Sequence, residues 1–181
     1  ATAPPIGVAL ALVLIFAGLG YKIASVPFHM WSPDVYEGSP LPVTAFLSVA
    51  SKAAGFGLVL RFFRDGMGSP AMLATVDWPL LLALVSAVTM TVGNLAAFGQ
   101  TNVKRLLAYS SIAHGGYLLM GVVAMGGAQR AESQAAVLFY FVAYLFMNLG
   151  AFYVVLHLAS PDRLGSEEIS AYRGLVRRSP L

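Results

Sequence analysis

The sequence contains no cysteine and few charged residues. The absence of cysteine excludes disulfide bonds, thiolate metal sites and iron–sulfur clusters within this chain. Charged residues make up 10% of the sequence and hydrophobic residues 58%, whereas about a quarter of the residues in a soluble domain are charged. The composition therefore predicts an integral membrane protein. The net charge of +3 is small and dispersed, which argues against nucleic-acid binding.

The start of the chain lacks the features of a secretory signal. It does not begin with Met, and no basic segment precedes the first hydrophobic run, so this run does not have the form of a signal peptide. The last residues, RRSPL, follow no recognisable closing element. We therefore expect the chain to be a central segment of a longer protein.

Hydrophobic runs fill most of the chain. A transmembrane helix needs about 20 predominantly apolar residues. Five runs reach this length, near residues 4–31, 42–63, 78–98, 105–125 and 135–158. We expect an all-α, polytopic bundle with five transmembrane spans that occupies residues 1–159.

Residues 160–181 form a polar tail. Within it, Ser166 precedes Glu167 and Glu168, a pattern typical of a helix N-terminus. Apolar residues then recur at helical spacing, at Ile169, Tyr172, Leu175 and Val176. We expect a short amphipathic helix that lies in the membrane interface.

The first hydrophobic run is too long for one straight crossing. Residues 4–31 would form a helix of roughly 42 Å, whereas the hydrocarbon core is about 30 Å thick. Pro27 lacks an amide N–H and would clash with the carbonyl of Ile23 in a helix, so we expect the first helix to be discontinuous there. The following segment, WSPDVYEGSPLP, is predicted to be an irregular acidic loop because four residues interrupt helices: Pro33, Gly38, Pro40 and Pro42.

Two lysines lie inside these runs, where charged side chains are costly and are usually retained for a function. Lys22 lies shortly before Pro27. Lys52 is about 15 Å into the second run, near mid-membrane. Burial favours a neutral amine over an ammonium group, so a buried lysine can hold and release a proton. Small residues that allow close helix packing flank Lys52: Ser48, Ser51, Ala53, Ala54, Gly55 and Gly57.

Both lysines also have structural interpretations. Lys22 lies near a helix end, where a long side chain can extend to the interface. Lys52 is too deep for this, but it could pair with a carboxylate on another helix. The aspartates lie in predicted loops or the tail, and so do all the glutamates: Glu37, Glu132, Glu167 and Glu168. We therefore expect any counter-charge for Lys52 to come from outside this chain.

One histidine lies near the middle of a predicted span. His114 is about 15 Å along its helix from Lys104. Histidine titrates near neutrality and can relay a proton through either ring nitrogen; the alternative is a hydrogen-bonded packing residue. A polar stripe on the same face favours a hydrated path: Ser110, Ser111, Tyr117 and Gly121.

The other two histidines, His29 and His157, lie near span ends, where we expect structural roles. No pair of histidines has the spacing of helical metal ligands, so we expect no metal site. The sequence also lacks a glycine-rich phosphate loop and a Ser/His/Asp nucleophile pattern.

The distribution of Lys and Arg among the short loops predicts the orientation. Five spans place the loop from Trp31 to Pro42, the loop at 99–105 and the tail on one side. That side carries Lys104, Arg105, Arg163, Arg173, Arg177 and Arg178, and the other carries Arg61, Arg64 and Arg130. We expect the first side to be cytoplasmic, in a bacterial inner membrane.

Two long blocks carry a family resemblance: YKIASVPFHMWSPDVYEGSPLPVTAFLSVASK and NVKRLLAYSSIAHGGYLLMG. They resemble the antiporter-like membrane subunits of respiratory complex I, the NADH-quinone oxidoreductase. The resemblance covers essentially the whole chain and corresponds to the middle of a longer subunit. The PDVYEG loop and the Ser51–Lys52 pair favour one branch of this family over its sister subunits.

The resemblance implies roles for three residues. Lys22 corresponds to the lysine of the family's discontinuous helix, Lys52 to the channel lysine of the next helix, and His114 to the histidine of the SSIAH block. The family's essential glutamate lies upstream of this region and a further lysine lies downstream. Neither belongs to this chain, so we expect it not to complete a proton path alone.

The resemblance further implies a function for the assembly. Protons would pass through Lys22, Lys52 and His114, coupled to quinone reduction elsewhere in a translocase, with no cofactor, metal or redox centre in this chain. The implied partners are the other membrane subunits, the lipid bilayer and a quinone bound elsewhere, with no nucleic acid. Two alternatives stay open: a sodium/proton antiporter subunit and a structural membrane scaffold.

Overall fold

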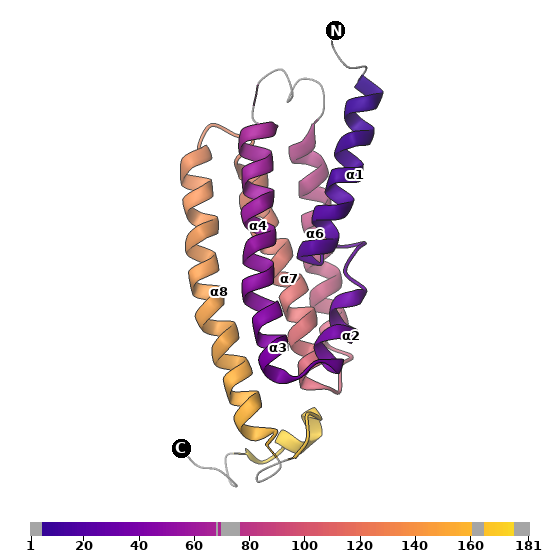
Figure 1. The fold of residues 1–181 in the computed structure, drawn as a ribbon, viewed down its shortest axis with the longest axis vertical. Coiled ribbons are helices and arrows are strands. Elements are labelled where there is room, and N and C mark those ends of the chain that lie inside the picture. The colour runs from indigo at the N-terminus through magenta and orange to yellow at the C-terminus, as the bar shows by residue number, and fades with distance from the viewer. Residues whose placement is uncertain (1–4, 68, 70–76, 161–164, 176–181) are drawn as a thin grey trace.

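The structure is a computed structural model and describes residues 5–67, 69, 77–160 and 165–175. The helices run up and down in one bundle (Figure 1). Five of them are long and apolar enough to cross a membrane: Ile6–Ile23, Leu41–Gly66, Trp78–Ala97, Val103–Ala124 and Arg130–Leu158. The prediction of an all-α, five-span membrane fold is confirmed.

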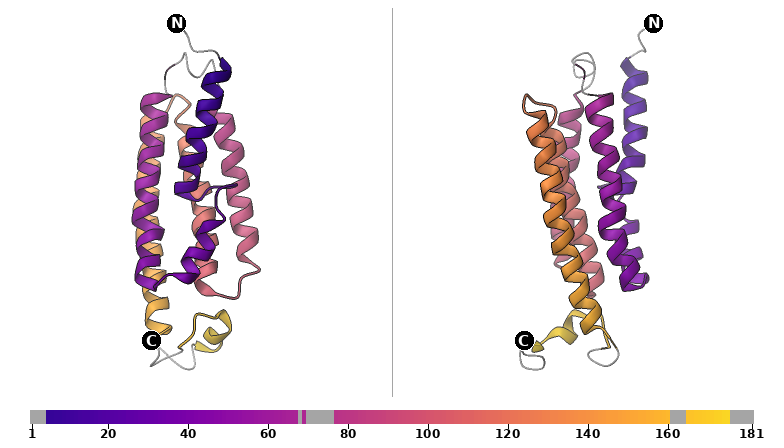
Figure 2. Two further views of the ribbon diagram at one scale, coloured as in Figure 1. Left: turned by 45° about the vertical axis from the view of Figure 1, so that its right-hand side comes forward. Right: turned by 60° about the vertical axis from the view of Figure 1, so that its left-hand side comes forward.

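The first span is broken near the middle of the bundle. Helix α1 (Pro5–Ile23) fills one half, and the short helix α2 (Trp31–Gly38) fills the other half (Figure 2). Between them the chain turns at Ala24, which has a φ of 57°, in the left-handed region that is unfavourable for a residue with a Cβ. The prediction of a discontinuous first helix is confirmed.

The prediction of an irregular loop after the break is wrong, because residues 31–38 form helix α2. Pro33 lies in the first turn of that helix, where an amide N–H would have no partner within the helix. The helix ends before Pro40, and α3 (Leu41–Phe46) begins after it, again with a proline, Pro42, in its first turn. The prolines therefore mark helix starts here.

The second span runs without a break from Leu41 to Gly66 but changes its winding. A π-helical turn, Leu47–Ser51, separates α3 from α4 (Lys52–Arg61), and a second one follows at Phe62–Gly66. Single π turns inside α-helices are rare and frequently lie at functional sites. The first of them places Lys52 directly at the start of α4.

Close packing sets the position of α7 (Val103–Ala124) against α6 (Trp78–Ala97). A Cβ added at Gly93 would lie 2.6 Å from the backbone nitrogen of Ala113, and one added at Gly116 would lie 2.7 Å from that of Met90. Small residues let the two backbones meet. Helix α7 thus lies between α6 and α8 (Arg130–Leu158), in the interior of the bundle (Figure 1).

This contact makes a testable prediction. Gly116→Ala should lower the thermal stability of the membrane protein, since a forced methyl group in a packed interior costs about 1–3 kcal/mol. The matched control is Gly150→Ala on α8, where an added Cβ meets nothing within 4 Å. Thermal unfolding of the two purified variants checks this, and equal midpoints would show that α6 and α7 can separate without cost.

The polar tail docks on the start of α7. A β-bridge joins Asn102 and Glu168, and a 3₁₀ turn follows at Ile169–Tyr172. The Ser166 hydroxyl accepts a hydrogen bond from the Glu168 amide at 3.1 Å, but the N-cap of the turn is Glu168, so Ser166 does not cap it. The helical element is therefore a single 3₁₀ turn; Val176 lies outside the described residues, and the interfacial position of the tail stays a prediction. Partial burial, together with nearby Glu167, raises the pKa of Tyr172.

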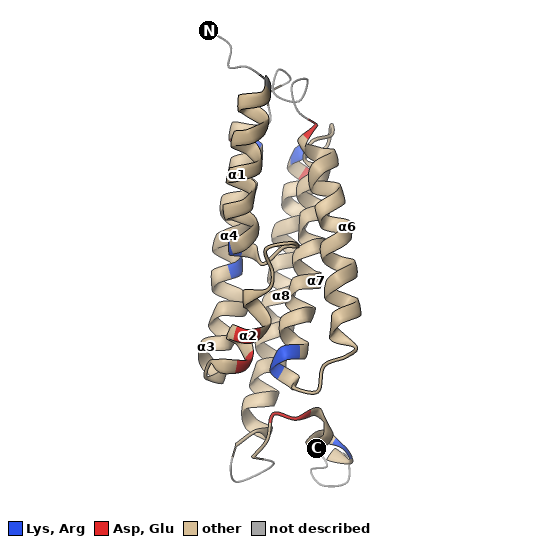
Figure 3. Cartoon of the chain, turned by 90° about the vertical axis from the view of Figure 1, so that its right-hand side faces the viewer, with Lys and Arg blue, Asp and Glu red and all other residues tan. Residues whose placement is uncertain are grey.

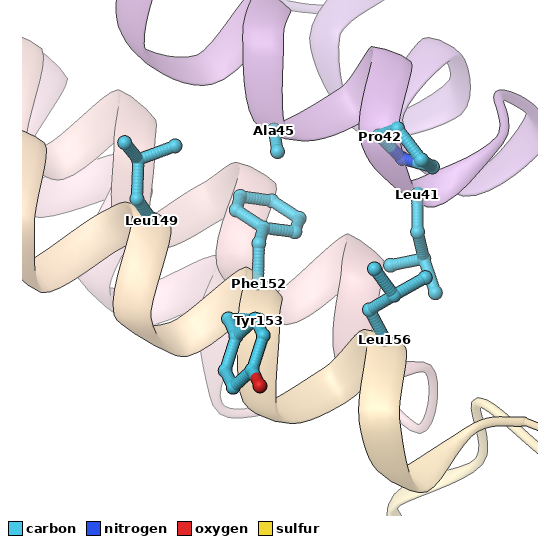
Figure 4. Close-up of a pocket in the computed structure, with 7 residues that line it drawn as sticks. All are labelled: Leu41, Pro42, Ala45, Leu149, Phe152, Tyr153 and Leu156. Atoms are coloured by element: carbon cyan, nitrogen blue, oxygen red, sulfur yellow. The ribbon is translucent and has the colours of Figure 1, made fainter.

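The outer faces of the bundle are apolar. An apolar groove of about 330 Å³ lies between α3 and α8 (Figure 4), lined by Leu41, Pro42, Ala45, Leu149, Phe152, Tyr153 and Leu156. Such a surface suits lipid chains or a neighbouring helix.

Candidate functional site

Lys52 lies inside the bundle. Its side chain is 4% exposed, and its Nζ donates a hydrogen bond to the backbone carbonyl of Ser111 on α7. A Cβ added at Gly115 would lie 3.6 Å both from this Nζ and from the carbonyl oxygen of Ile23, so the glycine gives the amine room beside the broken helix. No carboxylate in the described part of the chain forms an ion pair with Lys52.

Lys22 lies in the last turn of α1, next to the break. Its Nζ donates a hydrogen bond of 2.9 Å to the hydroxyl of Ser51, the residue before Lys52. A Cβ added at Gly55 would lie 2.9 Å from Cγ2 of Ile23 and 3.2 Å from Cγ of Lys22, so α1 approaches α4 closely here. Basic residues thus lie at mid-height of the bundle beside the break (Figure 3).

The polar backbone groups released by the break have partners inside the protein. The Val26 amide donates to the hydroxyl of buried Thr89 on α6 at 3.1 Å, and the Ser25 amide donates to the Gly20 carbonyl at 2.9 Å. The indole of Trp31 donates to the Tyr21 carbonyl at 2.9 Å. Backbone polar groups outside regular helix need such hydrogen-bond partners at membrane depth. The surrounding side chains and backbone therefore stabilise the break.

A buried group of hydroxyl and amide side chains surrounds the partner of Lys52. Its members, called the Ser111 cluster below, are Tyr36, Ser48, Ser111, Tyr144 and Asn148. Tyr144 donates to the Ser111 hydroxyl at 2.8 Å, and Asn148 donates to the Ser48 hydroxyl at 2.8 Å. Tyr36 reaches Ser111 from α2 at 3.5 Å. The cluster therefore joins four elements around one lysine.

His114 lies one turn further along α7 than Ser111. Its Nδ1 is 2.5 Å from the Tyr140 hydroxyl, and its ring centroid is 5.2 Å from that of Tyr144. The expected polar stripe divides here, because Tyr117 accepts a hydrogen bond of 2.8 Å from Asn94 on α6. One region, which contacts α8, contains Lys52, Ser111 and His114. Ser110 lies apart from it and lines a cavity of about 620 Å³ beside α6.

A second polar group, missed from the sequence, holds α2 to the start of α7. One nitrogen of Arg105, Nη1, lies 2.6 Å from Asp34 and 2.8 Å from Glu37, both on α2. This three-residue group is called the Arg105 clamp below. Its neighbour Lys104 is buried, donates to the Ser39 carbonyl at 3.0 Å and pairs with Glu167 of the tail at 3.0 Å. The acidic PDVYEG segment is thus the docking site of Arg105, whereas Lys104 binds just beyond it.

The remaining histidines do not join this region through any contact in the described residues. His29 is buried in the break, and its Nδ1 has no hydrogen-bond partner among them. His157 is exposed near the end of α8. Across the described residues, no group of three or more His, Asp or Glu could hold a metal ion.

The position of His114 leads to a graded prediction for the proton transport that the family resemblance implies. His114→Ala should lower ion transport moderately, because water can occupy the polar space left by the ring and carry protons past it. His114→Leu should lower it more, because the larger apolar side chain excludes that water. Ion transport by both variants in one membrane preparation decides this. Wild-type rates in both would make His114 a packing residue.

Residues 2–181 match the protein family described as "NADH:quinone oxidoreductase/Mrp antiporter, TM". The chain belongs to this family. The chain is 56% identical over 170 residues to NADH-quinone oxidoreductase subunit N 2 of Sorangium cellulosum. It is 50% identical over 183 residues to NADH-quinone oxidoreductase subunit N of Anaeromyxobacter sp.. These alignments cover 92% and 97% of the chain, but only 32% and 34% of the relatives. The chain thus spans about a third of their length.

Two solved structures of respiratory complexes resemble the chain. In respiratory complex I from Thermus thermophilus, the matched chain is 45% identical with a TM-score of 0.71, covering 95% of this chain and 35% of that one. In the membrane-bound sulfane sulfur reductase, an archaeal respiratory membrane complex, the matched chain is 28% identical with a TM-score of 0.84. The match covers 98% of this chain and 35% of that one. The sequence relatives carry the name subunit N.

Proposed function

We propose that this chain is the proton-translocating core of subunit N in a bacterial NADH-quinone oxidoreductase. The observation that carries the proposal is Lys52, an ionisable side chain 4% exposed inside the bundle, without an ion-pair partner among the described residues. Ionisable groups inside membranes usually mark a path for ions or protons. The relatives named subunit N support the assignment to this complex.

The proposed path follows the contacts around the break. Lys22 bonds to Ser51, the neighbour of Lys52, and Lys52 bonds to Ser111, one turn from His114. Each of the three ionisable groups changes the local electrostatic field when it gains or loses a proton, which alters the proton affinity of the next. Protons would move between them through intervening water, with the remaining groups supplied by the rest of the protein.

The rest of the proposal concerns the assembly. The partners would be the other membrane subunits, the bilayer lipids and a quinone bound elsewhere, so that this chain contributes to a translocase without a cofactor of its own. The end of the bundle that carries α2, the loop at 99–105 and the tail would face the cytoplasm of the bacterial inner membrane, as the Lys and Arg distribution predicts.

The first experiment separates proton pumping from sodium/proton antiport. Inverted membrane vesicles that contain the native complex are energised with NADH, and proton uptake is followed with a pH-sensitive dye. We expect uptake at the same initial rate in sodium-containing and sodium-free buffer. Uptake that requires sodium, or sodium flux without NADH oxidation, would favour the antiporter alternative.

A second experiment tests the structural scaffold. Methionine resembles lysine in length but cannot carry a proton, so the double variant Lys22→Met with Lys52→Met should assemble and lose NADH-driven proton uptake. Retention of full uptake by the assembled double variant would mean that the two lysines only hold the helices together.

A further inference from the structure

Two polar residues of helix α8 are turned into the bundle although most of that helix is apolar. Tyr144 is 2% exposed and Asn148 is 5% exposed. They lie one helical turn apart, and the Asn148 side chain donates to the Tyr144 hydroxyl at 3.1 Å. Burying a polar group costs free energy unless the group forms hydrogen bonds. The hydrogen-bond partners of Tyr144 and Asn148 therefore indicate the role of the pair.

The first contact leads to the partner of Lys52. Tyr144 donates to the hydroxyl of Ser111 at 2.8 Å, and the carbonyl of the same Ser111 accepts the hydrogen bond from Lys52. Ser111 of α7 therefore bonds to α8 through its side chain and to Lys52 through its backbone carbonyl. A shift of Ser111 would move the acceptor of Lys52.

The second contact leads to the segment that carries Lys52. Ser48 lies in the π turn that ends at Ser51, immediately before Lys52. Asn148 donates to the Ser48 hydroxyl at 2.8 Å, and the Ser48 carbonyl lies 3.4 Å from the Tyr144 hydroxyl. A tyrosine hydroxyl has one proton, so Tyr144 can bond to Ser48 or to Ser111 at one time. The pair thus contacts both the lysine's own helix and the helix of its acceptor.

We propose that Tyr144 and Asn148 are positioning residues for Lys52, which set the orientation of its π turn and of its carbonyl acceptor. This inference rests on the proposed function and adds α8 to the proton path. A fully bonded network of buried polar groups fixes one geometry more strictly than apolar packing does. Tyr144 and Asn148 are neutral, so their hydrogen bonds to Ser111 and Ser48 do not require Lys52 to be charged.

The test uses two variants that each remove the hydrogen bond between Tyr144 and Ser111 in the native complex. Tyr144→Phe deletes the hydroxyl and keeps the ring beside His114, and Ser111→Ala deletes the acceptor and keeps the carbonyl that Lys52 uses. Each should lower NADH-driven proton uptake about two- to tenfold, the effect of one lost hydrogen bond on a rate. Both variants remove the Tyr144–Ser111 bond. Tyr144→Phe also removes the bond from Asn148, and Ser111→Ala also removes the contact with Tyr36. Because one bond is shared, the double variant should lose less than the product of the two single losses.

A matched control lies on the same helix. Tyr153 is 71% exposed on α8, so Tyr153→Phe should keep the wild-type rate. The pH profile of proton uptake is the readout that a purely structural role would leave unchanged, and it should shift in the same direction in Tyr144→Phe and Ser111→Ala. The titratable groups near Lys52 on other elements are Lys22, Tyr36, His114 and Tyr144. Tyr144→Phe removes the last of them, whereas Ser111→Ala retains all four.

The outcomes separate this inference from the proposed function. A wild-type rate and pH profile in Tyr144→Phe and Ser111→Ala, with uptake lost in Lys52→Ala, would overturn the positioning role and leave the proposed function standing. Wild-type uptake in Lys52→Ala would overturn both. If Tyr144→Phe fails to assemble, Ser111→Ala decides alone, since it leaves every aromatic contact in place. Additive losses in the double variant would also contradict the inference.

Discussion

Replacing Lys52 by alanine is expected to reduce NADH-driven proton uptake by about tenfold or more, the scale of losing a positioned proton-transfer group, while the complex still assembles. The side chain is buried, and its amine bonds to the Ser111 carbonyl. The nearby Lys22 does not occupy that place, because its amine bonds to Ser51 instead. Dye-monitored uptake by inverted vesicles, normalised to the amount of assembled complex, measures the loss.

The arginine variant distinguishes proton exchange from positive charge. Lys52→Arg keeps a cation and a hydrogen-bond donor, but a guanidinium group does not release its proton at any accessible pH. We expect uptake to stay low in this variant. The control is Arg61→Ala on the same helix, whose side chain is 83% exposed; it should pump normally. Normal pumping by Lys52→Arg would rule out proton exchange at this residue.

The membrane topology could be predicted from the sequence because length and hydrophobicity determine it. Runs of about 20 apolar residues locate the spans, and the excess length of the first run together with Pro27 predicts its break. Depth along a helix follows from residue count, so Lys52 and His114 could be singled out as interior groups. Helix α2 was missed because a proline in the first turn of a helix gives the same local signal as a proline in a loop.

The partners of these residues could not be predicted from the sequence, because they depend on helix packing. Tyr144 lies 33 positions from Ser111, and a tyrosine in a span has the same pattern as an ordinary packing or interface aromatic. The i, i+4 spacing of Tyr144 and Asn148 in the apolar central part of α8 was an available signal. The π turn before Lys52 follows from no residue preference; small residues permit it without specifying it.

The Arg105 clamp was also missed, since its arginine lies 71 positions from Asp34 and 68 positions from Glu37.

Removing the arginine of the Arg105 clamp is the second change with a large expected effect. In Arg105→Ala, Asp34 and Glu37 would lose the cation of α7 that holds them, so α2 would no longer be tied to the start of α7. Tyr36 lies on the buried face of the same helix and contacts Ser111. We therefore expect proton uptake to fall about tenfold, with a loss in thermal stability of only about 1 kcal/mol, because these ion pairs are partly exposed.

Three further variants test this explanation. Arg105→Lys should recover only part of the activity, because an ammonium group cannot reproduce the geometry of the guanidinium group. Removing all three charges, with Arg105→Gln, Asp34→Asn and Glu37→Gln together, should recover more than Arg105→Gln alone, because the amides can bond to one another without repulsion. If the triple variant is as inactive as Arg105→Gln, the positive charge itself is required at this end of α7. The clamp would then act on the proton path directly, and its effect would not depend on the position of α2.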